Sequence, residues 1–256
     1  MSTPHVTSPP APTAPPAPTA PTGPSVPVAI VTAAGSGIGR GIAAELAKAG
    51  YRLSLLDISD TVETLAHDLG AIATVGSLTE PADLQRLVDA TLKRYGRIDA
   101  VVNGAGHAKN DELLKVTDQE RHDGLDMLLL SVVRMARLVT PYMEEAGKGA
   151  FVNLSSYTAF EPMGMVPVNS AMRTALTSFT KLYADGHAAK GIRMNNLMPG
   201  FVDSWPEDPA FLAKIPAGRY ATTGEIGGLA RFLVSDDAAY INGESIRIDG
   251  GAARSL

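Results

Sequence analysis

The sequence of 256 residues contains no cysteine. This absence excludes disulfide bonds, thiolate metal sites and cysteine nucleophiles, and it fits a reducing compartment. Basic residues are too few for a general nucleic-acid binder, because 22 Lys and Arg stand against 27 Asp and Glu and the net charge is −5. No apolar run approaches the ~20 residues that span a bilayer, and no secretory signal opens the chain. We therefore expect a cytoplasmic protein that binds neither membranes nor nucleic acid.

Proline is unevenly distributed along the chain. Many of the 18 prolines lie before residue 28, in a segment that is otherwise mostly Ala, Thr and Ser. Such a segment lacks the large apolar side chains that offset the entropy of ordering. We predict a disordered tail over residues 1–26 and a single folded domain over residues 27–256. A ligand for a proline-recognition domain is the alternative reading of the tail.

From Val28 onward, short β-branched runs alternate with segments of helical period. The predicted strands are 28–32, 52–56, 71–75, 100–102, 150–154, 193–198 and 245–248, and the predicted helices include 61–69, 119–146, 170–189 and 225–235. Strand–helix alternation with short loops is typical of a parallel sheet with helices on both faces. The fold class predicted is therefore α/β, a single doubly wound Rossmann domain with a parallel sheet of about seven strands.

The first predicted strand runs into a small-residue turn, Thr32-Ala33-Ala34-Gly35-Ser36-Gly37-Ile38-Gly39, which opens a helix. Small residues let backbone amides approach a pyrophosphate, and the helix N-terminus favours its charge. Asp57 ends the second strand, near the ~20-residue spacing of an acid that binds ribose. The predicted dinucleotide contacts here are Gly35, Ser36, Gly37, Ile38, Gly39 and Asp57. A packing turn, with Asp57 capping the next helix, is the alternative.

Asp57 also bears on the choice of cofactor. A carboxylate at this position accepts a hydrogen bond from the 2′-hydroxyl of NAD and repels the 2′-phosphate of NADP. Arg40 is the counter-argument, because its guanidinium can pair with that phosphate. We expect NAD, with NADP less favoured.

At this point the chain resembles the short-chain dehydrogenase/reductase family over residues 28–251. The motifs that carry the resemblance are the turn at 32–39, Asn103-Gly104-Ala105-Gly106, Val152-Asn153-Leu154-Ser155-Ser156, Pro199-Gly200-Phe201-Val202-Asp203-Ser204 and Asp249-Gly250-Gly251. The resemblance implies a nicotinamide cofactor. It adds Asn103, Ala105, Gly106, Arg173, Pro199, Gly200, Val202 and Ser204 to the predicted cofactor contacts.

The resemblance also implies a catalytic Asn-Ser-Tyr-Lys tetrad, and this chain departs from it. Ser156 matches the serine, but Leu128, Asn169 and Arg173 stand where the family has Asn, Tyr and Lys. Asn169 has no usable acid/base pKa, so it cannot act as a general acid. Arg173 can hydrogen-bond ribose hydroxyls, but its pKa is too high for proton shuttling. The expected catalytic residues are Ser156, Asn169, Arg173 and, as a substitute acid, His107.

Three functional hypotheses follow from the altered tetrad. The first is a reductase with a small imine or carbonyl substrate, because a protonated imine needs no acid from the protein. Tyr157 and Asp203 are further candidate acids, each with a structural alternative as a packing aromatic and as a cap. The second hypothesis is an NAD-binding sensor or scaffold without turnover. The third is a structural subunit that pairs with an active homologue.

The remaining features bear on metals, substrate and assembly. His67, His122 and His187 lie on predicted helices with no partner at metal-ligand spacing, so no metal site is expected. The segment with Trp205, Phe211, Leu212 and Ile215 corresponds to the family's variable substrate lid. Because residues 127–133 are apolar nearly all round, and because the resemblance implies it, we expect a homotetramer or homodimer.

Overall fold

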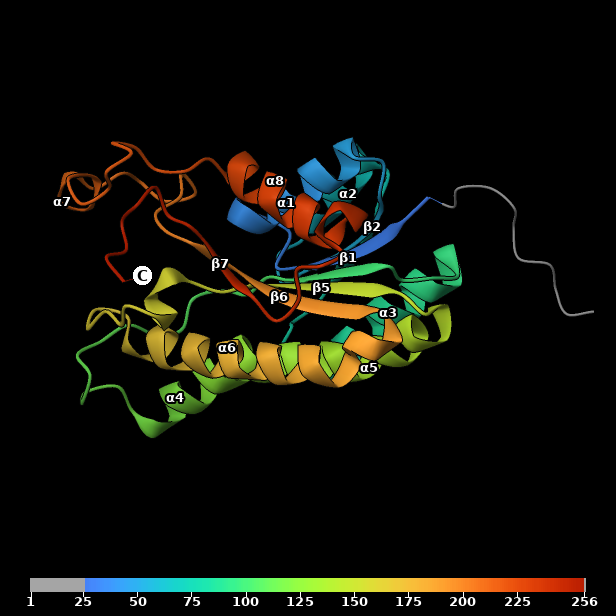
Figure 1. The fold of residues 1–256 in the computed structure, drawn as a ribbon, viewed down its shortest axis with the longest axis horizontal. Helices are drawn as coiled ribbons and strands as arrows, with labels where there is room; N and C mark the ends of the chain where they lie inside the picture. The colour runs from blue at the N-terminus through green and yellow to red at the C-terminus, as the bar shows by residue number, and fades with distance from the viewer. Residues whose placement is uncertain (1–25, 256) are drawn as a thin grey trace, which may run out of the picture.

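The computed structural model describes residues 26–255 and confirms the predicted α/β class (Figure 1). One parallel sheet of seven strands has the order β3-β2-β1-β4-β5-β6-β7. The strands are β1 (Val28–Thr32), β2 (Arg52–Asp57), β3 (Ile72–Val75), β4 (Ala100–Asn103), β5 (Gly149–Leu154), β6 (Ile192–Pro199) and β7 (Ser245–Ile248). The predicted tail over 1–26 lies, apart from its last residue, outside the described residues and stays a prediction.

Helices cover both faces of the sheet, as Figure 1 shows. They are α1 (Gly37–Lys48), α2 (Thr61–Leu69), α3 (Pro81–Tyr95), α4 (Asp118–Leu125), α5 (Ser131–Ala146), α6 (Pro167–His187), α7 (Pro209–Leu212) and α8 (Thr223–Val234). Helices α1, α2 and α8 lie on one face, and α4, α5 and α6 lie on the other. No helix within residues 26–255 is both long and apolar enough to cross a membrane.

The two cores follow from the two-residue period of the strands. In β1, Val31 packs with the core of α1, α2 and α8, whereas its neighbour Ile30 packs with α3 and α5 on the other face. Both side chains are completely buried, and each such burial contributes about 1.5–3 kcal/mol. Because both faces are covered, the strands are apolar without alternation, which is why the sequence shows continuous β-branched runs.

The helix predicted over 119–146 is wrong as a single helix. Helix α4 ends at Leu125, a wider π-helical turn follows at Asp126–Leu130, and α5 begins at Ser131. The turn carries Leu128, which is fully buried against Ala108, Val116 and Val168. Apolar periodicity does not reveal one extra residue in a helix, and π-helical turns occur mostly at functional sites.

Two other helices differ from the prediction at their starts. Helix α6 begins at Pro167 and not at Ser170, since proline suits the first helical position. This places Asn169 in the first turn of α6. Helix α8 begins at Thr223, because Thr222 and Glu225 form a capping box. The short helix α7 was not predicted.

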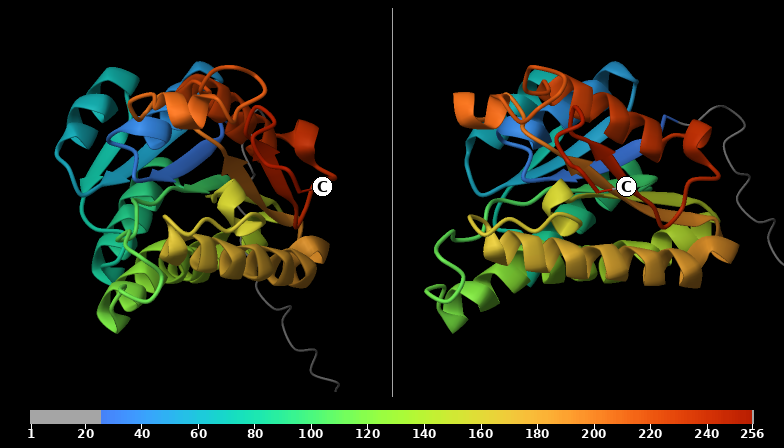
Figure 2. Two further views of the ribbon diagram at one scale, coloured as in Figure 1. Left: turned by 90° about the vertical axis from the view of Figure 1, so that its left-hand side faces the viewer. Right: turned by 60° about the vertical axis from the view of Figure 1, so that its left-hand side comes forward.

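The strand order reverses between β1 and β4. The chain moves outward from β1 to β2 and β3, then returns to the other side of β1 to form β4. Ligands of doubly wound sheets bind where this order reverses, outside the carboxyl ends of the strands. In Figure 2 the loops that follow β4, β5 and β6 gather at this end of the sheet. These loops hold some of the predicted site residues, whereas Asn169 and Arg173 lie on α6.

Candidate active site

The turn between β1 and α1 has the geometry of an anion-binding helix start. Gly37 adopts a positive φ of 50°. Ser36 makes no side-chain cap bond to α1, and the first turn of α1 has no acidic residue. The first amides of α1 therefore stay open to a ligand, and the helix dipole favours a negative one. A side chain at Gly39 would place its Cβ 2.0 Å from the Ala33 carbonyl oxygen, so only glycine lets α1 pack this close.

Asp57 lies beside this turn and holds it. One carboxylate oxygen accepts the Gly35 N–H at 2.9 Å, and the other accepts the Ser59 N–H at 2.9 Å. A Cβ on Gly35 would lie 2.9 Å from the Asp57 carboxylate carbon, so glycine permits the contact. Asp57 is thus joined to the turn and also makes the local contact expected of its capping alternative.

Ala33 and Gly104 depart from the motifs of the family that the sequence resembles, and both lie next to Thr32. Ala33 has φ 51°, a left-handed conformation that costs a non-glycine residue about 1–2 kcal/mol. The Thr32 hydroxyl donates to the Gly104 carbonyl at 2.8 Å. A Cβ on Gly104 would meet the Thr32 carbonyl oxygen at 2.4 Å. The glycine at 104 therefore allows β1 and β4 to approach closely beneath the site.

Asn103 lies in a buried polar network and not on an open surface. Its amide donates to the Asn153 oxygen at 2.8 Å, and Asn153 donates to Thr180 at 3.0 Å. Asn103 is 4% exposed. The network ties β4 and β5 to α6, so it positions the loop that carries Ala105 and Gly106. A direct cofactor contact by Asn103 stays a prediction.

Ser155 and Ser156 follow β5 directly and have different surroundings. The Ser156 oxygen accepts hydrogen bonds from Thr158, from its N–H at 3.2 Å and from its hydroxyl at 3.0 Å. The Ser156 proton is therefore available to a ligand, because both of these bonds use acceptor capacity. The Ser155 hydroxyl is buried and has no hydrogen-bond partner among the described residues. No sequence pattern pointed to Ser155.

Helix α6 brings Asn169 and Arg173 to the end of β5, one helical turn apart on the same face. The Asn169 amide lies 3.5 Å from the Asn110 side-chain oxygen. Arg173 is 6% exposed, and its guanidinium donates to the Leu154 carbonyl. Burial lowers the pKa of Arg173 to about 10. The charge stays on the guanidinium at neutral pH.

His107 faces the loop that follows β6. Its ring stands edge-on to Trp205, with 5.1 Å between the ring centroids. Burial lowers the pKa of His107 from its ordinary value, and the positive charge of Arg173 lowers it further. The imidazole is thus neutral at pH 7 and lies within the electrostatic reach of Arg173.

The two other candidate acids make structural contacts. The Tyr157 hydroxyl donates to the Met163 sulfur at 3.0 Å, and burial raises the pKa of Tyr157. Asp203 accepts the Thr223 N–H at 2.9 Å at the start of α8. These contacts match the packing and capping alternatives for the two residues.

The loop after β6 completes the crevice. Pro199 ends β6, and Gly200 approaches the Asp249 backbone so closely that a Cβ would lie 2.9 Å from its Cα. Ser204 faces Gly37, since a Cβ on Gly37 would lie 3.3 Å from the Ser204 Cβ. Val202 is buried and bridges to Ala221. The glycine turn and this loop therefore lie side by side.

An aromatic wall lies beyond the loop. Phe201 stacks on Phe211 with 4.8 Å between ring centroids. Phe201 also contacts Tyr157 at 6.1 Å and Tyr220 at 5.4 Å. Of the lid residues named from the sequence, Phe211 belongs to this wall. Such a wall suits a small, partly apolar substrate.

Comparison with known proteins agrees with this geometry. A family model described as enoyl-(acyl carrier protein) reductase matches residues 32–253. The chain belongs to the short-chain dehydrogenase/reductase family. It is 31% identical to the 3-oxoacyl-[acyl-carrier-protein] reductase FabG of Escherichia coli (strain K12), a match that covers 88% of this chain and 96% of that protein. The protein is thus an oxidoreductase of the short-chain type.

Two further relatives show how widely this family varies. Oxidoreductase UcpA of Escherichia coli (strain K12) is 35% identical, over 88% of this chain and 93% of that protein. The crystal structure of L-sorbose reductase from Gluconobacter frateurii, complexed with NADPH and L-sorbose, has a TM-score of 0.82 and 25% identity, over 91% of this chain and 98% of that chain. The first of these relatives is named only as an oxidoreductase, and the second is named for L-sorbose.

Proposed function

We propose that this short-chain oxidoreductase reduces a small imine or carbonyl compound with NADH, through an active site that lacks the usual proton donor. The observation that carries the proposal is the pair on α6, where Asn169 and Arg173 stand in place of the family's Tyr and Lys. The cofactor half of the crevice keeps its open amides, its close glycines and its acid at Asp57.

The residues that fit the cofactor lie on three loops. The backbone amides that face the pyrophosphate are those of Ser36, Gly37, Ile38 and Gly39. The Gly35 N–H holds Asp57, which accepts from an adenosine ribose hydroxyl. The nicotinamide end is lined by residues of the loops after β4 and β6, namely Ala105, Gly106, Pro199, Gly200, Val202 and Ser204. Arg173 donates to hydroxyls of the nicotinamide ribose. Bound there, the reduced nicotinamide supplies a hydride, with its electron pair, to the substrate carbon.

The side chains opposite the nicotinamide end orient the substrate. The Ser156 hydroxyl has its proton available, and the Asn169 amide can both donate and accept. Neither group is an acid at neutral pH. A protonated imine carries its proton already, so its carbon accepts hydride with no proton from the protein. Imines are therefore the better substrates in this site.

A carbonyl substrate needs a proton, and His107 is the candidate donor. The imidazole is neutral at pH 7 because burial and Arg173 lower its pKa. Only a small fraction of the protein then carries the proton at that pH. Carbonyl reduction is accordingly slow and increases at lower pH, which distinguishes it from the imine reaction at fixed imine protonation.

NADH is preferred over NADPH because Asp57 repels a 2′-phosphate. The Asp57 carboxylate is held in place by Gly35 and Ser59, so it does not turn away without loss of two hydrogen bonds. Arg40 is exposed at the start of α1 and is the group that favours NADPH. The solved sorbose reductase holds NADPH, so direct binding of both cofactors tests this choice.

The alternative function is that of an NAD-binding sensor or scaffold without turnover. It is favoured by the loss of the acid together with a well-formed cofactor turn. A homodimer or homotetramer suits either function, because Tyr142 on α5 and Leu182 on α6 leave apolar surface exposed.

The deciding experiment measures NADH oxidation by its absorbance with matched cyclic imines and ketones. NADH binding is measured in parallel by fluorescence, and Ser156→Ala is the site control. Oxidation with imines and little with ketones supports the proposal. Tight NADH binding with no oxidation across the whole panel refutes it and establishes the binding protein.

A further inference from the structure

Arg173 is the one charged side chain that is buried within residues 26–255. The other buried polar side chains are Ser, Thr and Asn residues, which carry no charge. A buried charge is costly unless an opposite charge or a full set of hydrogen bonds accompanies it. The surroundings of Arg173 therefore indicate what the site is built to receive.

The protein supplies Arg173 with little compensation. The guanidinium makes one hydrogen bond, to the Leu154 carbonyl, and no carboxylate lies within ion-pair distance among the described residues. Among residues 26–255, the buried side-chain N and O atoms without a hydrogen-bond partner are the hydroxyls of Ser54 and Ser155. The other N–H groups of Arg173 are not among them, so they remain accessible. These N–H groups are thus left for a ligand.

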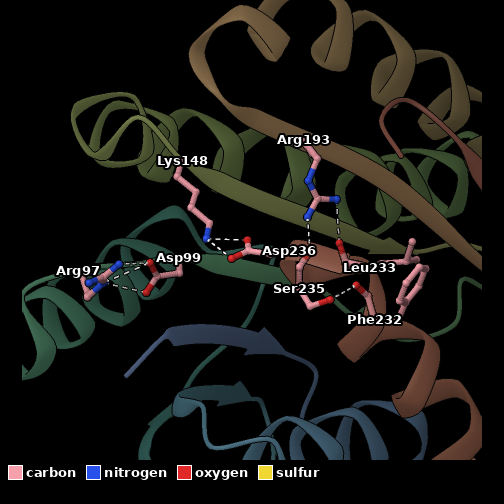
Figure 3. Close-up of polar contacts among 8 residues, drawn as sticks. All are labelled: Arg97, Asp99, Lys148, Arg193, Phe232, Leu233, Ser235 and Asp236. Carbon is pink, nitrogen blue, oxygen red and sulfur yellow. Dashed lines mark hydrogen bonds and ion pairs between the residues drawn. The ribbon is translucent and has the colours of Figure 1, made fainter. Parts of the chain in front are cut away.

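At the amino ends of β5 and β6, by contrast, the charged side chains have partners within the protein (Figure 3). Lys148 pairs with Asp236 at 2.6 Å. Arg193 donates to the carbonyls of Leu233 and Ser235, both at 2.9 Å. Burial lowers the pKa of Arg193, and the negative charge of Asp236 opposes that lowering. An open groove of about 900 Å³ lies there, yet its charges have partners within the protein.

The neighbours of Arg173 do not supply the missing negative charge. Asn169, one turn before it, is neutral. His107 is kept neutral in part by Arg173 itself. Ribose hydroxyls of a bound cofactor give hydrogen bonds but no charge.

We propose that Arg173 binds a carboxylate carried by the substrate beside its reacting carbon. The substrate class is then a small imine with a carboxylate on the imine carbon. This inference rests on the proposed reductase function for the identity of the reacting group. The carboxylate site itself stands on the burial of Arg173 and its single hydrogen bond.

The reaction balances without an acid from the protein. The protonated imine C=N takes one hydride with its two electrons at carbon and becomes a secondary amine, while NADH becomes NAD⁺. No proton is exchanged in the step, and the carboxylate is unchanged. Arg173 orients the acceptor carbon and neutralises the carboxylate, which otherwise repels an incoming hydride.

The test measures binding to the full-length protein saturated with NADH, by calorimetry. The probes are pyrrole-2-carboxylate, a planar and unreactive analogue, and its methyl ester. The variants are Arg173→Met, which removes the charge, and Arg173→Lys, which keeps it. Arg231→Met, an exposed arginine on α8, is the matched control. NADH affinity is measured for each variant, which separates loss of the cofactor from loss of the anion.

We expect the dissociation constant of the carboxylate to be lower than that of the ester by about 30-fold or more, and we expect Arg173→Met to remove this difference. Arg173→Lys retains most of it, and Arg231→Met leaves it unchanged. Equal binding of acid and ester overturns the inference. So does a carboxylate preference that survives Arg173→Met with NADH affinity intact.

Turnover separates this inference from the proposed function. NADH oxidation is compared for 1-pyrroline-2-carboxylate and 1-pyrroline. Faster oxidation with the carboxylate supports both conclusions. Equal rates leave a reductase but refute the carboxylate site. Arg173-dependent carboxylate binding without oxidation of either compound refutes the reductase and leaves the carboxylate site standing.

Discussion

The two ends of the strands differ in how far their charged groups have partners. We call them the amino edge, where the strands begin, and the carboxyl edge, where they end. At the amino edge, Lys148 forms an ion pair with Asp236, and Arg193 donates to carbonyls at the end of α8 (Figure 3). At the carboxyl edge, the Arg173 guanidinium has one hydrogen bond and no ion pair within the described residues, and the Ser36 side chain makes no cap bond to α1. Stability is concentrated at the first edge, whereas the second is arranged for ligands.

Restoring a proton donor at the carboxyl edge has the largest expected effect. The double variant Asn169→Tyr with Arg173→Lys is expected to raise ketone reduction by about 10²–10⁴-fold, the usual contribution of general acid catalysis. Steady-state NADH oxidation with a ketone panel measures the gain. An unchanged rate, with normal folding and NADH binding, contradicts our placement of the substrate oxygen beside Asn169.

Neutralising one arginine at each edge tests the comparison directly. Arg193→Met is expected to lower the free energy of unfolding by about 2 kcal/mol or more, because several carbonyls lose a charged donor. Arg173→Met is expected to raise it by about 1–3 kcal/mol in the absence of ligand, because an unpaired buried charge is removed. Urea denaturation of both variants measures the two signs. The same sign in both variants breaks the comparison.

Exchanging Asp57 sharpens the prediction of NADH as cofactor. Asp57→Ser removes the charge that repels a 2′-phosphate, so the ratio of kcat/KM for NADPH over NADH is expected to increase about tenfold or more. Where turnover is absent, the ratio of the two dissociation constants serves instead. A variant that keeps its preference for NADH shows that Asp57 acts only on the turn at Gly35.

Relieving strain at the carboxyl edge is expected to have a smaller effect. Ala33→Gly removes the penalty of the left-handed conformation, φ 51°, but increases the freedom of the unfolded chain. The net gain is expected to be about 0.5–1 kcal/mol. A melting temperature higher by about 2 °C confirms it. Ala49→Gly, after the end of α1, is the control for glycine substitution alone.

The smallest expected effect is the pH dependence that His107 contributes. Its pKa is lowered in the folded state, so the unfolded chain takes up this proton first as the pH falls below 6.5. The contribution to stability is therefore complete above pH 6.5 and is lost as the pH falls toward the folded pKa. Melting temperatures from about pH 8 to about pH 5 are expected to fall less in His107→Gln. Parallel curves contradict this.

Sequence patterns predicted the fold of this molecule, and the cofactor contacts that they suggest stay a prediction. The runs in β1 and β5 and the glycines of the 32–39 turn are local features, and their spacing carries the fold. The long helix over 119–146 could not be resolved by the same reasoning. The inserted turn that buries Leu128 depends on packing against Val168 from another helix.

The catalytic end shows the same division. The sequence by itself shows that residue 169 is an asparagine and residue 173 an arginine, so their side-chain chemistry is known before the fold. That Arg173 is buried with a single partner is not visible there. Compensation of a charge depends on groups distant along the chain, such as the Leu154 carbonyl.

Residue order alone determined the parallel α/β sheet, the glycine-rich turn before α1 and the side-chain chemistry available at positions 169 and 173, because each follows from local periodicity or from the chemistry of a single side chain. Tertiary structure decided which polar groups have partners. It joined Asp57 to Gly35, gave Lys148 and Arg193 their partners, and left Arg173 with a single hydrogen bond. Hydrogen bonding and desolvation depend on distances in space, and the fold alone sets those distances.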